Sequence, residues 1–175
     1  QGLTTLERLS HRGACGCEEN TGDGAGVLLQ IPDKFLRKVT AAAGLPSLPP
    51  LGHYGVGMVF LPTDLREMNI MKAVWERVAR EEGQRLLGWR DVPTNNAALG
   101  PTAKAAEPRI AQVFIARNPA LLDQDAFERK LYLIRKRTAG EASAAGLVQR
   151  KLYYVCSFSS RTMVYKGMLT PEQLR

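Results

Sequence analysis

The segment HRGACGCEENTGDGAG, residues 11–26, carries five glycines and links a helical sequence pattern to a strand-like one. Glycine tolerates positive φ and lets two backbones approach closely, so this segment can fold tightly under a neighbouring element or beside a small ligand. The apolar run Val27–Ile31 follows directly and ends at Pro32, which is typical of a buried strand. The sequence therefore predicts the local order of helix, glycine-rich turn and strand.

The turn does not match the common phosphate-binding patterns. Neither GxxxxGK[ST] nor GxGxxG at the start of a helix is present, and the turn follows a helix instead of preceding one. Taken alone, it is more typical of a helix packed on a sheet than of a ligand site. Cys15 and Cys17 form a CxC pair, and only Cys156, His11 and His53 remain to complete a set of metal ligands. We therefore expect structural or free thiols and no metal site.

Length and composition predict one globular domain, because 175 residues with 45% hydrophobic content suffice for a sizeable core. The formal charge of +7 is dispersed, and its densest group, residues 135–137, closes a predicted helix where cations favour the dipole. We therefore expect no nucleic-acid partner. Three cysteines favour a reducing compartment. No apolar stretch approaches the ~20 residues of a membrane span and no leader opens the chain, so we expect a soluble, cytoplasmic protein without a membrane partner.

Hydrophobic periodicity extends the prediction outward from the turn. Leucines at positions 3, 6 and 9 predict a helix over residues 2–12, and its weak N-cap suggests that the natural helix begins further upstream. Residues 93–108 are rich in turn formers and predict an ordered excursion across a surface or a plain connector. The other predicted strands cover residues 27–31, 53–61, 85–92 and 110–116, and 152–158 with 162–165 form an antiparallel hairpin. Three helices are predicted to be capped by Asp33, by Asp64 and by Asp123 or Asp125, and the last of them runs through Thr138. A further helix begins at 170–172.

These elements amount to about six strands and four or five helices without strict alternation, which indicates an α+β fold with a largely antiparallel sheet covered by helices. No Ser/His/Asp or Cys/His set is identifiable from residue types and spacing. The adjacent carboxylates Glu18 and Glu19 project in different directions, as expected of surface charge. On the residues alone, a globular α+β domain is the limit of the inference.

Several sequence blocks resemble one known family in the same order. Residues 6–35, LERLSHRGACGCEENTGDGAGVLLQIPDKF, are similar to the region after the first strand in the glutaminase domain of glutamate synthase large subunits. The later blocks that resemble the same domain are GWRDVPT at 88–94, LGPT at 99–102, FERKL at 127–131, SFSSRT at 157–162 and VYKGML at 164–169.

The resemblance implies a partial class II glutamine amidotransferase domain over residues 1–175. Its expected fold is the αββα four-layer sandwich of the N-terminal-nucleophile hydrolases, incomplete at both ends. Such a domain hydrolyses L-glutamine, and the ammonia reacts with 2-oxoglutarate at a second site of the parent enzyme. The resemblance implies FMN, an iron–sulfur cluster and NAD(P)H or ferredoxin for that parent and none of them for this chain. It also implies the remaining domains of the large subunit and a small reductase subunit as partners, in the cytoplasm or the plastid stroma.

The family's chemistry indicates which parts of the site this chain carries. The family nucleophile is a cysteine at the mature N-terminus whose α-amine accepts the thiol proton, whereas position 1 here is Gln1. The nucleophile and the oxyanion hole are therefore expected outside residues 1–175, and the isolated chain is expected to be inactive. A non-catalytic module for ligand sensing or subunit contact, built on the same fold, is the alternative.

By resemblance, Arg12 and Gly13 lie near the nucleophile. Arg12 either supports the cysteine thiolate electrostatically or satisfies carbonyl groups at the end of the first helix, and the sequence favours neither role. The other matching positions are assigned to the backbone geometry of the turn in preference to substrate contact. They are Gly22, Asp23, Gly24 and Gly26.

Overall fold

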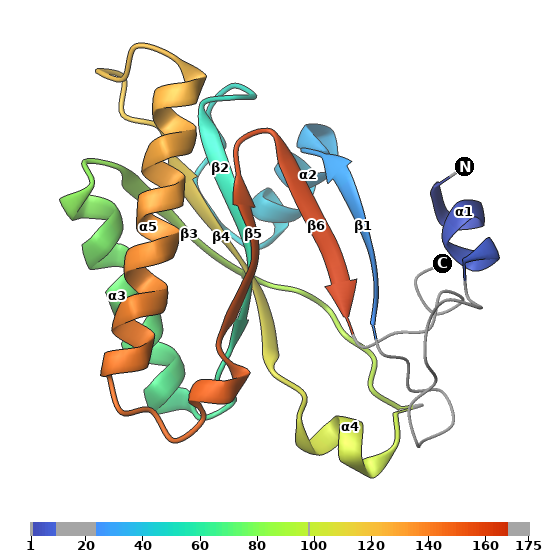
Figure 1. Cartoon of the computed structure of the whole chain (residues 1–175). Helices are drawn as coiled ribbons and strands as arrows, with labels where there is room; N and C mark the ends of the chain where they lie inside the picture. Colours follow the sequence, from blue (N-terminus) through green and yellow to red (C-terminus); the bar gives the residue numbers. More distant parts are fainter. Residues whose placement is uncertain (1, 10–23, 98, 168–175) are drawn as a thin grey trace.

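The computed structural model describes residues 2–9, 24–97 and 99–167 (Figure 1). The helix start expected at 170–172 and the end of the helix expected over 2–12 lie outside these residues. The described elements are α1 (Gly2–Arg8), β1 (Ala25–Gln30), α2 (Asp33–Ala42), β2 (Tyr54–Leu61), α3 (Leu65–Glu81), β3 (Arg85–Asp91), α4 (Pro101–Ala105), β4 (Arg109–Ala116), α5 (Gln124–Ala144), the 3-10 turn η2 (Arg150–Leu152), β5 (Tyr154–Ser159) and β6 (Thr162–Gly167).

The described strands form two antiparallel sheets, a large one in the order β3-β4-β2-β5 and a small one of β1 and β6. The predicted hairpin is wrong in its pairing, because β5 pairs with β2 while β6 pairs with β1, from Ala25 opposite Gly167 to Gln30 opposite Thr162. The short turn after β5 therefore carries the chain from one sheet to the other (Figure 1). Local turn rules miss this because the partner of β6 lies more than a hundred residues earlier in the chain.

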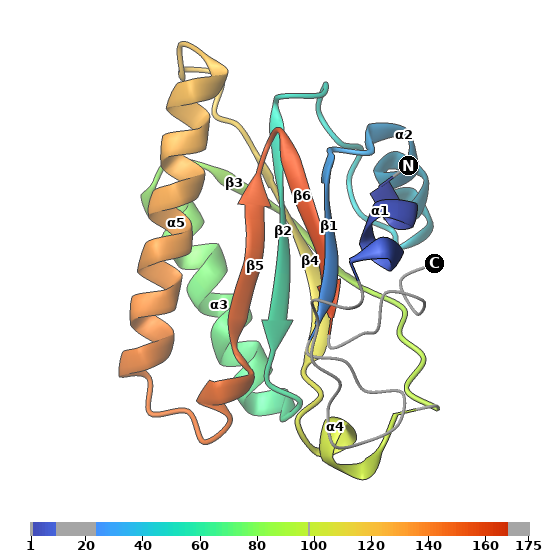
Figure 2. The same cartoon turned by 45° about the vertical axis from the view of Figure 1, so that its right-hand side comes forward.

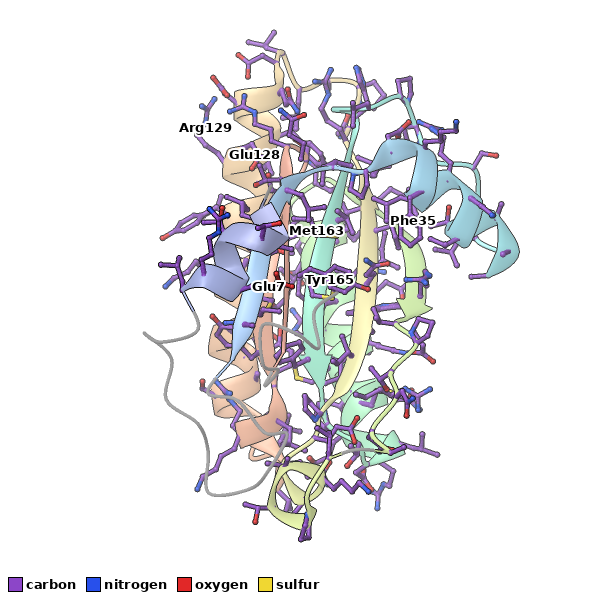
Figure 3. All side chains as sticks on the ribbon, turned by 90° about the vertical axis from the view of Figure 1, so that its right-hand side faces the viewer. Glu7, Phe35, Glu128, Arg129, Met163 and Tyr165 are labelled. Carbon is purple, nitrogen blue, oxygen red and sulfur yellow. The ribbon has the colours of Figure 1, made fainter. Side chains whose placement is uncertain are left out.

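The elements stack in layers. Helices α3 and α5 cover one face of the large sheet, and the small sheet lies on its other face (Figures 1 and 2). Helix α1 lies on the outer side of the small sheet, and α2 packs beside that sheet at one end (Figure 3). The α+β class and the order of helix, sheet, sheet and helix expected from the resemblance are confirmed by this arrangement.

Two hydrophobic cores occupy the two faces of the large sheet. The first lies under the helices, and its members include Trp75, Phe127, Leu131, Ile134 and Phe158. The second lies between the sheets and under α2, with Leu36, Tyr54, Met58, Phe114 and Met163 as its largest members. The large sheet is therefore buried on both sides, which explains why β2 and β4 read as nearly continuous apolar runs.

Two glycines of β2 allow α5 and the neighbouring strands to pack closely. Small and bulky residues alternate at the start of this strand, whose sequence is YGVGMVFL. A Cβ atom on Gly55 would lie 2.6 Å from Cδ1 of Leu131 on α5, and one on Gly57 would lie 2.6 Å from Cγ1 of Val113 on β4. A methyl group at either position would therefore require the adjacent side chains to shift.

The predicted start of α3 is confirmed, because the carboxylate of Asp64 accepts hydrogen bonds from the backbone N–H groups of Arg66 and Glu67. For α5, Asp123 is the cap, since it accepts from the N–H of Ala126 at 2.6 Å. Such a cap contributes about 1 kcal/mol.

The prediction that α5 ends at Thr138 is wrong, because the helix continues to Ala144. Gly140 inside a helix costs about 1 kcal/mol relative to alanine. The last turns are held by the complete burial of Ala142 and by the ion pair of Glu141 with Arg77 of α3. Tertiary contacts therefore override the local signal for a helix end.

Three further boundaries differ from the predictions. Asp33 is not a cap: Pro32 occupies the cap position without a side-chain hydrogen bond, and the Asp33 carboxylate is bound by other side chains. The excursion at 93–108 contains α4, which begins at Pro101, a residue suited to a first helical turn. Strand β5 begins at Tyr154 instead of 152, because the preceding residues form η2.

Candidate functional site

The site expected from the sequence lies where the glycine-rich turn enters β1. Only the last part of that turn belongs to the residues that the structure describes. Gly24 and Gly26 are described, whereas the positions outside the described residues are Arg12, Gly13, Cys15, Cys17, Gly22 and Asp23. The described part of the site is therefore the start of β1 and the end of β6 beside it.

The two described glycines bring β1 against β6 without intervening side chains. Gly24 adopts a φ of +123°, a region that L side chains rarely occupy. Gly26 pairs with Lys166, and a Cβ atom on Gly26 would lie 2.7 Å from the Cβ of Lys166 and 3.0 Å from the carbonyl oxygen of Tyr165. This geometry agrees with the backbone role predicted for both glycines. That this role takes preference over substrate contact stays a prediction.

An open hollow of about 380 Å³ lies over this junction. Its walls are mostly backbone and small side chains, because the lining residues are Gly24, Ala25, Gly26, Val27, Leu28, Val164, Lys166 and Gly167. Its one cation is Lys166, whose ammonium lies 4.6 Å from the centre of the Tyr154 ring. Among the described residues of the wall there is no carboxylate, thiol or imidazole, and Lys166 is the one titratable side chain.

Cys156 is the described thiol nearest to this junction, and its environment opposes nucleophilic chemistry. It is half-buried on β5 and packs against the core between the sheets. Burial raises the pKa of this thiol, although the charges of Lys166 and Arg135 act in the opposite direction. The thiolate is the reactive form of cysteine, so Cys156 is protonated at neutral pH and is a poor nucleophile.

The turn between the sheets is fixed by a carboxylate that sequence reasoning did not single out. Glu128 of α5 accepts hydrogen bonds from the N–H and the hydroxyl of Ser160, both at 2.6 Å, and from the hydroxyl of Ser159 at 3.1 Å. Figure 3 shows Glu128 at the same end of the molecule as the start of β6. Glu128 therefore fixes the turn that precedes β6, the strand whose far end lines the hollow.

A buried amide between the sheets was also missed. Gln112 of β4 is completely buried, its Oε1 accepts from Arg90 at 2.8 Å, and its Nε2 lies 3.6 Å from the sulfur of Met163. The signal for it was present, because a glutamine in the apolar strand RIAQVFIA must find partners when that strand is buried. Gln112 links the large sheet to β6 through Met163.

Within residues 2–9, 24–97 and 99–167, no group of three or more His, Cys, Asp and Glu side chains is arranged to hold a metal ion. No helix in this part of the chain is both long and apolar enough to cross a membrane.

Comparison with known proteins identifies the class to which this fold and junction belong. The sequence model of the class-II glutamine amidotransferases matches residues 1–175, and the chain belongs to this family.

Relatives of this chain include glutamate synthases. The chain is 44% identical over 174 residues to the large chain of the NADPH glutamate synthase of Bacillus subtilis, and 41% identical over 173 residues to the chloroplastic ferredoxin-dependent glutamate synthase of Oryza sativa. It is 36% identical over 174 residues to the NADH glutamate synthase of Schizosaccharomyces pombe. These alignments cover 99%, 98% and 97% of this chain but only 11%, 10% and 8% of the respective relatives.

Proposed function

We propose that this chain is part of the glutaminase domain of a glutamate synthase, in which glutamine is hydrolysed to glutamate and ammonia for transfer to 2-oxoglutarate. The match of the class-II amidotransferase family over residues 1–175 carries this proposal. Identities of 36% to 44% with glutamate synthases that use three different electron donors support the specific parent. The electron donor is left open by the same comparison.

In the proposed reaction, the thiol of an N-terminal cysteine attacks the side-chain amide carbon of glutamine. Ammonia leaves as the C–N bond breaks, and water then hydrolyses the thioester to glutamate. This chain contributes the scaffold: β1 and β6 form a backbone-lined wall, and Gly24 and Gly26 keep that wall free of side chains. Arg12 is proposed to support the thiolate. The isolated chain, which has Gln1 at position 1, is therefore proposed to be inactive.

FMN, an iron–sulfur cluster and the electron donor are assigned to other parts of the proposed parent. The described residues do not fit an iron–sulfur cluster, since such clusters are held by several cysteine thiolates and Cys156 is the one cysteine among them. The chain's proposed partners are the remaining domains of the large subunit and a small reductase subunit. The proposed compartment is the cytoplasm, or the plastid stroma in a plant or alga.

Glutamine hydrolysis by the full-length polypeptide in which this chain occurs tests the proposal. We expect glutamate to be released from glutamine, the activity to be abolished by iodoacetamide, and the Cys156→Ser variant to stay fully active because this thiol is not the nucleophile. The 175-residue chain alone should release no glutamate. Glutamine turnover by the isolated chain, or a full-length polypeptide without glutaminase activity, would contradict the proposal.

The role of Arg12 is tested by Arg12→Lys in the same polypeptide. Lysine keeps the charge but lacks the planar guanidinium fork. If Arg12 supports the thiolate, we expect kcat/KM for glutamine to fall about tenfold, and the pH at which the nucleophilic cysteine becomes alkylated to rise. An unchanged alkylation profile with an unchanged kcat/KM leaves only the structural role at the helix end.

A further inference from the structure

A larger hollow lies away from the glycine-rich junction, at the end of the large sheet that is uppermost in Figure 1. It has a volume of about 710 Å³ and lies where α3 turns into β3, where β4 ends and where β2 begins. Its wall contains three arginines and a histidine but no carboxylate. These residues are Arg80, Arg85, Arg117 and His53. We call this site the guanidinium hollow.

None of the three guanidinium groups has an acceptor within residues 2–9, 24–97 and 99–167. The Nε atom of Arg117 is buried without a hydrogen-bond partner, and Arg80 and Arg85 take part in no ion pair there. A buried donor without an acceptor costs about 1–3 kcal/mol and is rare in folded proteins. Arg80 in the last turn of α3 is partly accounted for by the helix dipole, but Arg85 and Arg117 are not.

The nearest acidic residues in the sequence are committed to other cations. Glu81 binds Arg77 and Arg137, and Glu82 binds Lys130 and Arg137. Neither carboxylate therefore neutralises the guanidinium hollow next to it.

The backbone around the hollow is held in place by an independent set of hydrogen bonds. Oε1 of the buried Gln84 accepts from the N–H of Asn118 at 2.9 Å, and the side-chain amide of Asn118 donates to the carbonyl of Gly83 at 2.9 Å. The N–H of Arg117 donates to the carbonyl of His53 at 2.9 Å. The walls are therefore fixed before any ligand binds, which lowers the entropic cost of binding.

From this arrangement we propose that the guanidinium hollow binds a small molecule bearing phosphate or several carboxylate groups, with Arg117 as the central donor. Guanidinium forks match the oxygen pairs of phosphate and carboxylate in two parallel hydrogen bonds. An occupant of this kind supplies the acceptor that the buried Nε of Arg117 lacks. The site shares no lining residue with the junction proposed for glutamine chemistry, so its ligand is distinct from the amide substrate.

Calorimetric titration of the full-length polypeptide with pyrophosphate and with citrate, at low and at physiological ionic strength, tests the proposal. We expect at least one of the two anions to bind and the affinity to fall as salt increases. The anion that binds more tightly tells a phosphate site from a carboxylate site. Arg117→Gln should weaken binding about tenfold, because a charge-assisted hydrogen bond is lost.

Two further variants test whether Arg117→Gln weakens anion binding directly. Arg85→Gln changes an exposed side chain that cannot disturb the core, and it should also weaken binding several-fold, about as expected for one lost ionic contact. Arg150→Gln is the matched control, because the Nε of Arg150 is also buried without a partner while its two terminal nitrogens donate to Tyr153 and Ser143. Binding by this control should equal that of the wild type.

The proposal is overturned if neither anion binds, which is also the result expected if a carboxylate from another part of the polypeptide fills the hollow. Equal weakening by the Arg150→Gln control, or no weakening by Arg117→Gln and Arg85→Gln, overturns it as well. Each of these outcomes leaves the glutaminase proposal untouched, because glutamine hydrolysis is measured separately.

Discussion

The hydrogen bond between Tyr54 and Asp33 joins β2, a central strand, to α2, and its removal tests how the second core is held together. The completely buried phenol of Tyr54 donates to Oδ1 of Asp33 at 2.9 Å. The other carboxylate oxygen of Asp33 accepts from Nε of Arg37 at 2.8 Å. Arg37 also donates to the carbonyls of Leu48 and Pro49 at 2.7 and 2.6 Å. The cluster therefore holds the segment between α2 and β2 against α2.

Tyr54→Phe removes one hydrogen bond to a charged acceptor and leaves the ring packing unchanged. Such bonds contribute about 1.5–3 kcal/mol, and the lower end applies because the Asp33 carboxylate keeps its bond to Arg37. We therefore expect the free energy of unfolding to fall by about 1.5 kcal/mol. Asp33→Ala should cost about 2.5 kcal/mol, because it leaves the buried Tyr54 hydroxyl without an acceptor. It also removes the ion pair with Arg37 and a negative charge in the first turn of α2.

Urea unfolding of both variants and of the double variant, followed by circular dichroism, provides the measurement. In the Tyr54→Phe background, Asp33→Ala should cost only about 1 kcal/mol, which gives a coupling energy of about 1.5 kcal/mol. A thermal melt should show Tyr54→Phe lowering Tm by about 3–6 °C for a chain of this size. If Asp33→Ala costs the same in both backgrounds, the two side chains are not coupled and the account of this cluster fails.

The same cluster makes stability depend on pH. The hydrogen bond from Arg37 lowers the pKa of Asp33, burial opposes this, and the Tyr54 hydroxyl lowers it further. Because the folded-state pKa lies below the unfolded value of about 3.9, the stabilisation is complete above the unfolded pKa and is lost as pH falls through the folded one. Tyr54→Phe should therefore lose less stability than the wild type on acidification below about pH 4.

Two further predictions concern the packing of β2 and the reactivity of β5. Gly57→Ala should destabilise the chain by about 2–3 kcal/mol and Gly55→Ala by about 1 kcal/mol. The added methyl group meets the stiff side chain of Val113 in the first variant and the adaptable end of Leu131 in the second. Equal urea midpoints for the two variants would contradict this packing. Cys156 should react with iodoacetamide at pH 8 more slowly in the folded chain than in urea, because burial raises its pKa. Peptide-resolved mass spectrometry measures the two rates, and equal rates would refute the burial of this thiol.

Local patterns were sufficient for most secondary structure. The Asp64 cap and the helix that follows it were predicted correctly because the signals for both lie within a few turns of one helix. The ends of α5 and the partner of β6 were not, because they depend on contacts far away in the chain. Ala142 and Glu141 extend α5 through packing against its neighbours, and β1 determines where β6 pairs.

The sequence predicted the glycine-rich turn of the candidate site but not the side chains that meet through tertiary contacts. The glycine-rich turn marked the junction with β1, since only glycine permits the backbone at Gly24 and the contact at Gly26. The positioning role of Glu128 gave no sequence signal, because its partner Ser160 lies 32 residues later and a surface glutamate looks the same. The guanidinium hollow likewise joins Arg80, Arg85 and Arg117 only through the meeting of three chain segments.

The sequence by itself determined the family, the α+β class and the residues that form most helices and strands, because these follow from blocks of residues and from periodicities of two and of 3.6. Tertiary structure alone decided that the strands divide into two sheets and that one turn, anchored by Glu128, joins them. It also decided where positive charge stays unmatched. The physical reason is that hydrogen-bond partners and charges from distant segments meet only after the layers have packed.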